Sequence, residues 1–364
     1  MSTPRVLVAG GGIAALEAVL ALQQAAGGRV APELLAPGRH FVYRPLAVVE
    51  PFADEPAILR MPLAEFGADR GVPVIRDALA AVREGGAVET LGGARLRYDA
   101  LVVALGARPL EAVPGALTFR GPQDAGRVAG LVRLARERRA RRLVFVVPAG
   151  TTWPLPLYEL VLQTALAVGG AARLALVTPE PFPLAAFGAP AGAAVAALLA
   201  ERGVDVHLAT RGDEVAGGRL LTDRGELPAD AVVALARLGG PHLPGLPSDP
   251  LGFIPVDEHA RVLGLDLVWA AGDVAAAGRK QGGLAAQQAA AAAAAIAALV
   301  TGEPLPPPEP PVLRGALVTG TGTLYLRHEH GGASEASDEP LWWPPAKVVA
   351  AHLGHYLAGR LARV

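Results

Sequence analysis

Residues 5–16 read RVLVAGGGIAAL, and this stretch decides the fold. An apolar, β-branched run over 5–9 is followed by three glycines, and residues 13–26 then repeat apolar side chains at helical spacing. This order predicts a strand, a tight turn and a helix.

The glycines of the turn stand at positions that carry a specific chemistry. Gly10, Gly12 and Ala15 form the Gly-x-Gly-x-x-Ala version of the dinucleotide-binding fingerprint. Gly10 permits the turn, Gly12 lets the backbone approach a pyrophosphate, and Ala15 lets the helix pack closely on the strand. The helix N-terminus then faces the negative charge. A turn that is merely rich in glycine is the alternative, and the flanking strand and helix argue against it.

The same α/β pattern continues and then restarts. Further strands of the first sheet are expected at 33–35 and 98–105. A second unit of strand, turn and helix begins at 142–147, and its expected continuation comprises 173–178, 191–202, 204–209 and 231–236. We therefore predict an α/β fold with two Rossmann-like, three-layer dinucleotide-binding domains, the second inserted in the first, plus a C-terminal segment. The predicted limits are 1–112 and 246–312 for the first domain, 113–245 for the second and 313–364 for the C-terminal segment.

Composition narrows the chemistry that this chain can perform. Its 364 residues are 52% hydrophobic, enough to bury a large core in two or three domains. The 33 basic residues balance 34 acidic ones, so no net field favours nucleic acid or an anionic membrane surface. The sequence contains no cysteine, which excludes disulfides, thiolate metal sites, iron–sulfur clusters and flavin–dithiol relays within this chain.

Two further features bear on location. The first predicted strand begins almost at the initiator methionine, which leaves no room for a signal peptide and makes a cytoplasmic location the default expectation. The longest apolar run, 284–300, consists mostly of alanine and is interrupted by Gln287 and Gln288, so we expect a buried helix and no membrane span. The sequence does not specify an oligomeric state and leaves an oligomer open.

Dinucleotide-binding domains usually carry an acidic residue at the end of the second strand, where it binds the adenosine ribose. Here that region reads Glu33-Leu34-Leu35-Ala36-Pro37, and Ala36 occupies the expected acid position. Either a backbone group binds the ribose, or Glu33 does so from a different register.

Four marks, in this order, give the chain a resemblance to a known family. They are the Gly10 turn, Tyr43-Arg44-Pro45-Leu46, Ala104-Leu105-Gly106-Ala107-Arg108-Pro109 and Ala271-Gly272-Asp273. Over roughly residues 4–315 the chain resembles the family that includes type II NADH dehydrogenases and sulfide:quinone oxidoreductases, within the wider disulfide-oxidoreductase-like flavoproteins.

The resemblance implies FAD as the cofactor. In that family the late aspartate accepts a hydrogen bond from a ribityl hydroxyl, and the next helix points its amides at the pyrimidine edge of the flavin, roles that fall to Asp273 and 280–284. A helix N-terminus or a lysine stabilises the negative charge of reduced flavin. The predicted FAD-binding residues are Gly10, Gly12, Ala15, Arg44, Pro45, Ala104, Gly106, Gly272, Asp273, Gly283 and Leu284. No metal ligands are predicted.

The corresponding turn of the second domain departs from the fingerprint. It reads Pro148-Ala149-Gly150-Thr151-Thr152-Trp153. Proline lacks the N–H group, and tryptophan places a large ring where a third glycine would allow close packing. The sequence therefore disfavours a conventional NAD(P)H pyrophosphate site. Sulfide:quinone oxidoreductases share this loss, but they work through cysteines that this chain does not have.

Three residues are candidates for a catalytic role. Lys280 and Lys347 are the only lysines beside 31 arginines, and both fall in segments expected beside the isoalloxazine. Trp343 lies in the run Trp342-Trp343-Pro344-Pro345, which could line a pocket for a planar apolar substrate or a quinone. The alternatives are solvated surface lysines and a hydrophobic plug that seals the domains.

These observations favour an FAD-dependent oxidoreductase. It would pass electrons between bound flavin and a small organic substrate or a quinone, without cysteine redox chemistry. Two alternatives stay open at this stage. One is a catalytically silent flavin-binding sensor or partner protein, and the other is an NAD(P)H dehydrogenase with a non-standard nicotinamide site.

Overall fold

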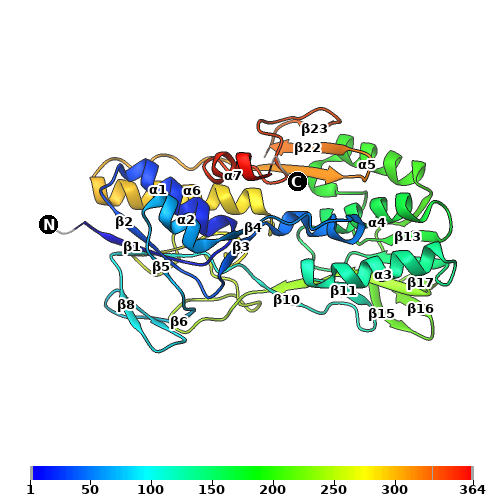
Figure 1. Ribbon diagram of the computed structural model, residues 1–364, viewed down its shortest axis with the longest axis horizontal. Helices are drawn as coiled ribbons and strands as arrows, with labels where there is room; N and C mark the ends of the chain where they lie inside the picture. The colour runs from blue at the N-terminus through cyan, green and yellow to red at the C-terminus, as the bar shows by residue number, and fades with distance from the viewer. Residues whose placement is uncertain (1–2, 330, 362–364) are drawn as a thin grey trace.

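Two five-stranded parallel sheets organise the chain in the computed structural model, which describes residues 3–329 and 331–361 (Figure 1). The first sheet has the order β20-β9-β1-β2-β5. Its strands are β1 (Arg5–Ala9), β2 (Ala31–Leu35), β5 (Val74–Ile75), β9 (Ala100–Val103) and β20 (Val268–Ala270). The second sheet has the order β11-β18-β12-β13-β14. Its strands are β11 (Leu117–Phe119), β12 (Arg142–Val146), β13 (Arg173–Val177), β14 (Val204–His207) and β18 (Ala231–Leu235). The predicted α/β fold class is confirmed.

Strand β1 is apolar on both faces because both faces are covered. Val6 and Val8 pack in the core with two helices, and Leu7 and Ala9 pack in the core on the other side of the sheet. The two helices are α1 (Ile13–Ala26) and α6 (Gly282–Thr301), which lie side by side in Figure 1. Their buried contact is built largely from alanine, whose small side chain lets the two backbones come close.

Helix α6 contains the apolar run predicted to be a buried helix. By length and composition it could cross a membrane, with a mean hydropathy of 1.6. Within the fold, 56% of its most apolar window is buried against the rest of the protein. The core helix of a folded domain has the same composition, so the run is explained by its packing on α1 and the first sheet.

The second sheet is covered by three helices and a small hairpin sheet. The helices are α3 (Ala125–Arg136), α4 (Leu155–Val168) and α5 (Ala189–Glu201), and the hairpin sheet is β15 (Gly212–Ala216), β16 (Arg219–Thr222) and β17 (Gly225–Pro228). The chain passes between the two sheets twice, through β10 (Arg108–Leu110) and β19 (Arg237–Gly239), which pair antiparallel. The Arg108 guanidinium joins the two passages by donating to the Gly240 carbonyl at 2.9 and 3.2 Å. The predicted residue limits of the domains stay a proposal.

Several elements were not expected from the sequence. They are β3 (His40–Val42), η1 (Arg44–Val48), η2 (Glu50–Phe52), β4 (Arg60–Pro62), α2 (Leu63–Arg70), β6 (Leu79–Arg83), β7 (Ala87–Thr90), β8 (Arg95–Arg97), η3 (Pro122–Asp124), η4 (Ala185–Phe187), β21 (Val312–Val318), β22 (Thr323–Glu329) and β23 (Ser334–Ser337). Strands β21, β22 and β23 form an antiparallel sheet that contacts α4 and α5. The C-terminal segment therefore begins on the second domain.

The chain then returns to the first domain, where α7 (Leu353–Leu361) lies against α1 (Figure 1). Glu17 of α1 is fully buried, and its carboxylate accepts hydrogen bonds from the backbone N–H groups of His352 at 3.0 Å and Leu353 at 2.6 Å. A carboxylate at this position satisfies N–H groups that have no partner within α7 and favours the positive end of its dipole. Glu17 therefore holds the C-terminal helix in place.

We expect Gly10→Ala to lower the free energy of unfolding by about 3 kcal/mol or more. Residue 10 has φ +143°, and a Cβ there would lie 2.1 Å from the Ala104 carbonyl oxygen. Gly12→Ala is the matched control, because residue 12 has φ −101° and no atom within 4 Å of the added Cβ. Denaturant unfolding of the cofactor-free variants measures both effects, and equal losses would contradict the account.

Candidate functional site

Strands β1, β9 and β20 end at the same edge of the first sheet because they are parallel, and the predicted cofactor residues follow them. Gly10 follows β1 and donates its N–H to the Leu35 carbonyl at 2.8 Å. Ala104 follows β9 and donates to the Ala9 carbonyl at 2.7 Å. Gly106 has φ +71°, which glycine adopts without strain. Ligands of open α/β sheets bind outside this edge, where the strand order reverses.

Helices α1 and α6 begin together at this edge. A Cβ added to Gly272 would lie 3.1 Å from the Ala14 Cβ of α1 and 3.3 Å from the Ala285 Cβ of α6. Gly272 also has φ +84° and donates its N–H to Gln288 of α6 at 2.8 Å. Glycine at this position therefore lets the two helix N-termini come together.

The turn before α1 leaves room for a ligand. Gly12 is the N-cap residue of α1 and has an extended backbone conformation. No atom lies within 4 Å of the position that a Cβ on Gly12 would take. Ala15 is fully buried against the sheet, as the fingerprint requires. The cradle expected for a pyrophosphate is thus open in front of the α1 N-terminus.

Asp273 follows β20 and is partly buried. Among the described residues, none donates a hydrogen bond to its carboxylate. Burial raises the pKa of Asp273, while the positive charges of Lys280 and Arg44 oppose that shift. A partly buried carboxylate that accepts no hydrogen bond from the described residues is chemically suited to accept one from a ligand hydroxyl.

Arg44 and Pro45 begin η1 on the other side of the site. The Arg44 side chain is exposed and forms no ion pair within the described part of the chain. The positive charge of Arg44 opposes the rise that burial causes in the pKa of Asp273. An arginine here is available to a phosphate group.

The first turn of α6 differs in part from the prediction. Gln281 is its N-cap, and the side-chain oxygen of Gln281 accepts from the Leu284 N–H at 2.8 Å. The Leu284 amide is therefore committed within the protein. The Gly283 N–H has no acceptor among the described residues, so it is the amide of this turn that could meet a ligand.

Lys280 is partly buried, so the alternative of a solvated surface lysine is wrong for it. Its ammonium donates to the Ala275 carbonyl and lies 3.9 Å from the centroid of the Phe253 ring. Burial lowers the pKa of Lys280, and the charge of Asp273 opposes the shift. The cation is held beside Asp273 by an aromatic face and a carbonyl.

Lys347 is also partly buried, with 11% of its side chain exposed. Its ammonium donates to the fully buried carboxylate of Glu159 in α4. The structure thus pairs this predicted catalytic lysine with an acid that sequence reasoning did not identify.

The two neighbouring tryptophans of the C-terminal segment differ. Trp342 packs edge-on against Tyr325 with the ring centroids 5.1 Å apart, and it donates to the Ala346 carbonyl at 3.0 Å. Trp343, the predicted pocket residue, is 85% exposed. Its role stays a prediction that no contact within the described residues supports.

The corresponding turn of the second domain is also open at Gly150, where nothing lies within 4 Å of the position that a Cβ would take, but the residues around it differ. Trp153, which precedes the N-cap residue Pro154 of α4, packs on Phe187 with the ring centroids 5.8 Å apart. Glu180 follows β13, where a dinucleotide-binding domain keeps its ribose acid. Its carboxylate already accepts from Tyr158 at 2.7 Å, from the Thr178 hydroxyl at 2.9 Å and from a backbone N–H at 3.1 Å. Glu180 could have been identified from the sequence, because it is an acidic residue that follows the second strand expected in this domain, at 173–178.

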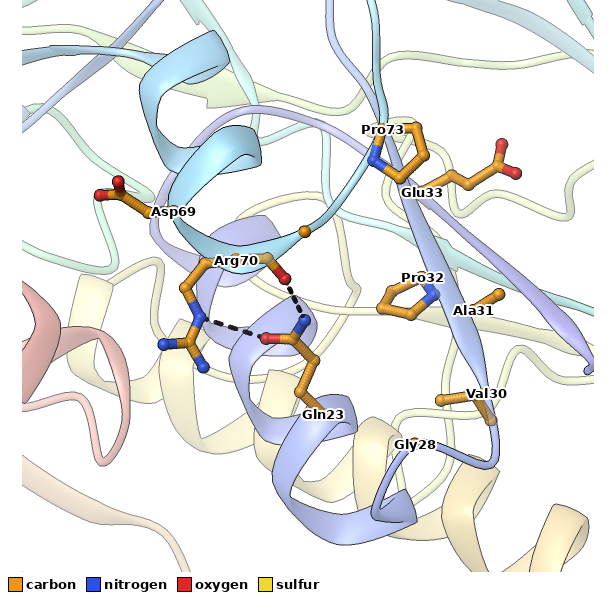
Figure 2. Close-up of a pocket in the computed structure, with 10 residues that line it drawn as sticks. Gln23, Gly28, Val30, Ala31, Pro32, Glu33, Asp69, Arg70 and Pro73 are labelled. Carbon is orange, nitrogen blue, oxygen red and sulfur yellow. Dashed lines mark hydrogen bonds between the residues drawn. The ribbon is translucent and has the colours of Figure 1, made fainter.

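The first domain lacks a ribose acid at its edge. Glu33 lies inside β2 opposite Leu7 and forms an ion pair with Arg5, so the proposed change of register is wrong. Figure 2 shows Glu33 beside a shallow depression of about 720 Å³ that is also lined by Gln23 and Arg70. That depression includes the residues that precede β2, so it lies at the opposite end of the strand from the edge of the sheet where the predicted cofactor residues lie.

The comparisons agree with this fold. The model of the pyridine nucleotide-disulphide oxidoreductase family matches residues 4–294, and the chain belongs to that family. Two Mycobacterium tuberculosis proteins described as NADH dehydrogenase-like are 32% identical over 237 residues, which is 60% of this chain. The match spans 59% of the length of those relatives.

Solved structures show the same fold. The sulfide:quinone oxidoreductase of Aquifex aeolicus matches with a TM-score of 0.81 at 16% identity, covering 92% of this chain and 87% of that one. A ferredoxin reductase of Rhodopseudomonas palustris matches with a TM-score of 0.69 at 21% identity, covering 89% and 82%. The predicted resemblance is confirmed at the level of the family, which is a family of oxidoreductases.

We expect Asp273→Asn to stabilise the cofactor-free protein at neutral pH by about 1 kcal/mol. Because burial raises the pKa of Asp273 in the folded state, the charged carboxylate costs stability as the pH rises through the interval between the unfolded and folded pKa values. The gain should therefore vanish at acid pH, where the group is neutral in both states.

Thermal unfolding between acid and neutral pH measures this effect. Asp77→Asn is the control, since hydrogen bonds from Thr90, Ala78 and Gly92 lower the pKa of its carboxyl, and that variant should lose stability at neutral pH. A loss of stability in Asp273→Asn at neutral pH would show that the carboxylate has partners within the protein.

Proposed function

We propose that this protein is an FAD-dependent oxidoreductase whose cofactor lies at the carboxyl edge of the first sheet. The observation that carries the proposal is the open backbone at Gly12, at the N-terminus of α1, together with the Asp273 carboxylate, which has no donor among the described residues and follows Gly272, where α1 and α6 meet. A dinucleotide has a pyrophosphate that can lie against the Gly12 backbone and hydroxyls that can donate to the Asp273 carboxylate. The family membership supports the same cofactor.

Each part of the site has a role in this proposal. The Gly10 to Gly12 turn and the α1 N-terminus hold the pyrophosphate, and the exposed Arg44 guanidinium provides a counter-charge. The Asp273 carboxylate accepts a hydrogen bond from a ribityl hydroxyl, and the Gly283 N–H faces the pyrimidine edge of the flavin. Lys280 adds positive charge beside Asp273, which stabilises an anionic ring. The bound flavin would supply the chemistry of electron-pair transfer.

We further propose that a small organic molecule or a quinone exchanges electrons with the flavin directly. The chain has no cysteine for a dithiol relay. The turn of the second domain carries Trp153, and the Glu180 carboxylate is occupied by the protein's own donors. The sulfide:quinone oxidoreductase with the same fold supports a quinone.

One observation favours the alternative of an NAD(P)H dehydrogenase with a non-standard nicotinamide site. It is the 32% identity to the NADH dehydrogenase-like proteins of Mycobacterium tuberculosis. A silent flavin-binding protein is the other alternative, and anaerobic reduction with a panel of electron donors distinguishes it from an enzyme. The cytoplasmic location and the oligomeric state stay predictions.

The purified protein should carry tightly but noncovalently bound FAD, because the cradle is built and no cysteine can tether the ring. Denaturation should release the cofactor, which chromatography then identifies. Gly12→Leu should abolish FAD binding by filling the cradle, with a change in folding stability no larger than that of Ala15→Gly. Release of FMN alone, or a colourless protein that does not take up FAD, would refute the cofactor assignment.

Glu180→Gln and wild type should both show slow flavin reduction by NADH and NADPH, without saturation at micromolar concentrations. The reason is that the Glu180 carboxylate already accepts three hydrogen bonds within the protein, which leaves too few acceptor sites to bind both hydroxyls of a ribose. Anaerobic stopped-flow absorbance measures the rate. Fast, saturable reduction in wild type that is lost in Glu180→Gln would establish the NAD(P)H dehydrogenase alternative.

A further inference from the structure

One end of the second domain carries a dense cluster of exposed arginines, which we call the arginine patch. Six of them fall at the end of α3, in the loop that follows it and at the start of β12, and a seventh begins β13. The whole chain has a net charge of −1, so this positive charge is a local feature. The patch consists of Arg133, Arg136, Arg138, Arg139, Arg141, Arg142 and Arg173.

Only two acidic side chains pair with the patch. Arg139 lies 3.3 Å from Glu137, and Arg142 lies 3.0 Å from Asp230. The other five guanidinium groups form no ion pair within the described part of the chain. Their positive charges are therefore available to a partner. These five are Arg133, Arg136, Arg138, Arg141 and Arg173.

The patch faces away from the first domain and from the proposed flavin site. Strand β12 begins in the patch at Arg142 and is followed by the turn in which Thr152 Oγ1 accepts from the Lys280 N–H at 3.2 Å. The carboxyl end of β12 thus points toward the first domain, and its amino end points away from it. In Figure 1 the end of α3 lies at the side of the molecule opposite to the first sheet. A partner bound there would leave the flavin site accessible.

The patch carries two features that cost folding stability. Arg138 has φ +60°, just after the end of α3, where glycine is the usual residue. Arg142 and Arg173 lie directly opposite each other in the register of β12 and β13, an arrangement that is unfavourable for like charges. The negative end of the α3 dipole favours cations in the last turn, which explains Arg133 and Arg136 alone. Positions that break local rules without a gain within the fold are expected at functional sites.

The composition of the patch favours carboxylates over phosphates as the partner's groups. Residues 131–142 contain no aromatic side chain on which nucleic-acid bases could stack. None of the large apolar side chains that are strongly exposed lies there either, so nothing is placed to enter a lipid surface. A phosphate backbone or a lipid surface would also bring continuous negative charge against Glu137 and Asp230. An acidic peptide can place its carboxylates opposite the unpaired arginines alone.

We propose that the arginine patch binds an acidic segment of a partner protein, whose Asp and Glu side chains pair with the five unpaired guanidinium groups. The partner anchors this protein in an assembly and leaves electron exchange at the flavin unchanged, because the patch lies at the far end of the second domain. This inference goes beyond the proposed function and does not require that it be correct.

The test is titration of the full-length protein with a fluorescein-labelled oligoglutamate peptide, followed by fluorescence anisotropy. The patch variant combines Arg136→Gln, Arg138→Gly and Arg173→Gln. The matched control combines Arg60→Gln, Arg95→Gln and Arg97→Gln, which removes the same charge from exposed arginines of the first domain. A labelled DNA duplex and phosphatidylglycerol vesicles are the competing probes.

We expect the patch variant to bind oligoglutamate about tenfold more weakly than wild type, while the control variant stays within about twofold. Added salt should weaken the wild-type binding, because exposed charges are screened. Thermal unfolding without a partner gives a second readout. Arg138→Gly and Arg173→Gln, each alone, should raise the unfolding midpoint, because the first removes an unfavourable backbone conformation and the second removes repulsion from Arg142.

Three results would overturn the proposal. Equal binding of oligoglutamate by wild type and both variants would leave the patch as a solvated surface. DNA or vesicle binding that is as tight as oligoglutamate binding and is lost in the patch variant would assign the patch to a phosphate-bearing partner. Self-association of the wild type that the patch variant loses would assign it to a second copy of this chain. A lower unfolding midpoint in both single variants would show that these arginines are kept for stability.

Discussion

The close approach of the Gly10 backbone to the Ala104 carbonyl is the constraint on which the rest of the structure depends. A Cβ at residue 10 would lie 2.1 Å from that oxygen, so only glycine lets β1 turn directly into α1 beside the end of β9. Gly272 serves the same purpose for α6, where it separates Ala14 from Ala285. The two contacts bring two helix N-termini to one edge of one sheet. The cradle at Gly12 and the free carboxylate of Asp273 are consequences of that geometry.

The second domain repeats the scaffold with different groups at its edge. Its sheet and helices have the same kind of order, but side chains at its edge contact one another, with Trp153 on Phe187 and Tyr158 on Glu180. A fold that can hold a dinucleotide does not have to hold one, because function resides in the groups at the edge. In the proposed function, the contacts at this edge and the absence of cysteine from the sequence favour a substrate that reaches the flavin directly.

Local signals made much of the fold predictable. The strand at 5–9 and the helix at 13–26 were predicted with the bounds that β1 and α1 have. The apolar run of the strand, the three glycines of the turn and the helical spacing of apolar residues all lie within one short stretch of sequence. Strands β21 to β23 were missed because buried and exposed side chains alternate only weakly along them. They pair with one another in a separate sheet, so neither main sheet predicts them. The Gly-Gly-Leu start of α6 was recognised, but Gln281 as its cap was not.

The site was harder to predict than the fold. Lys347 stood out because lysine is rare in this chain, yet its partner Glu159 lies 188 residues earlier, and no local pattern connects them. Trp342 and Trp343 are adjacent, and only the path of the backbone decides that the first packs inward and the second is exposed. Contacts between distant parts of the chain set the burial, and burial sets the chemistry of these groups.

A crystal structure of the protein grown with FAD tests the central claim most directly. The account predicts density for the pyrophosphate against the Gly10 to Gly12 turn and a ribityl hydroxyl within hydrogen-bond distance of Asp273, with no dinucleotide at the edge of the second sheet. Density for the cofactor at the Trp153 turn, or none at the first edge in protein that retains this fold, would contradict it.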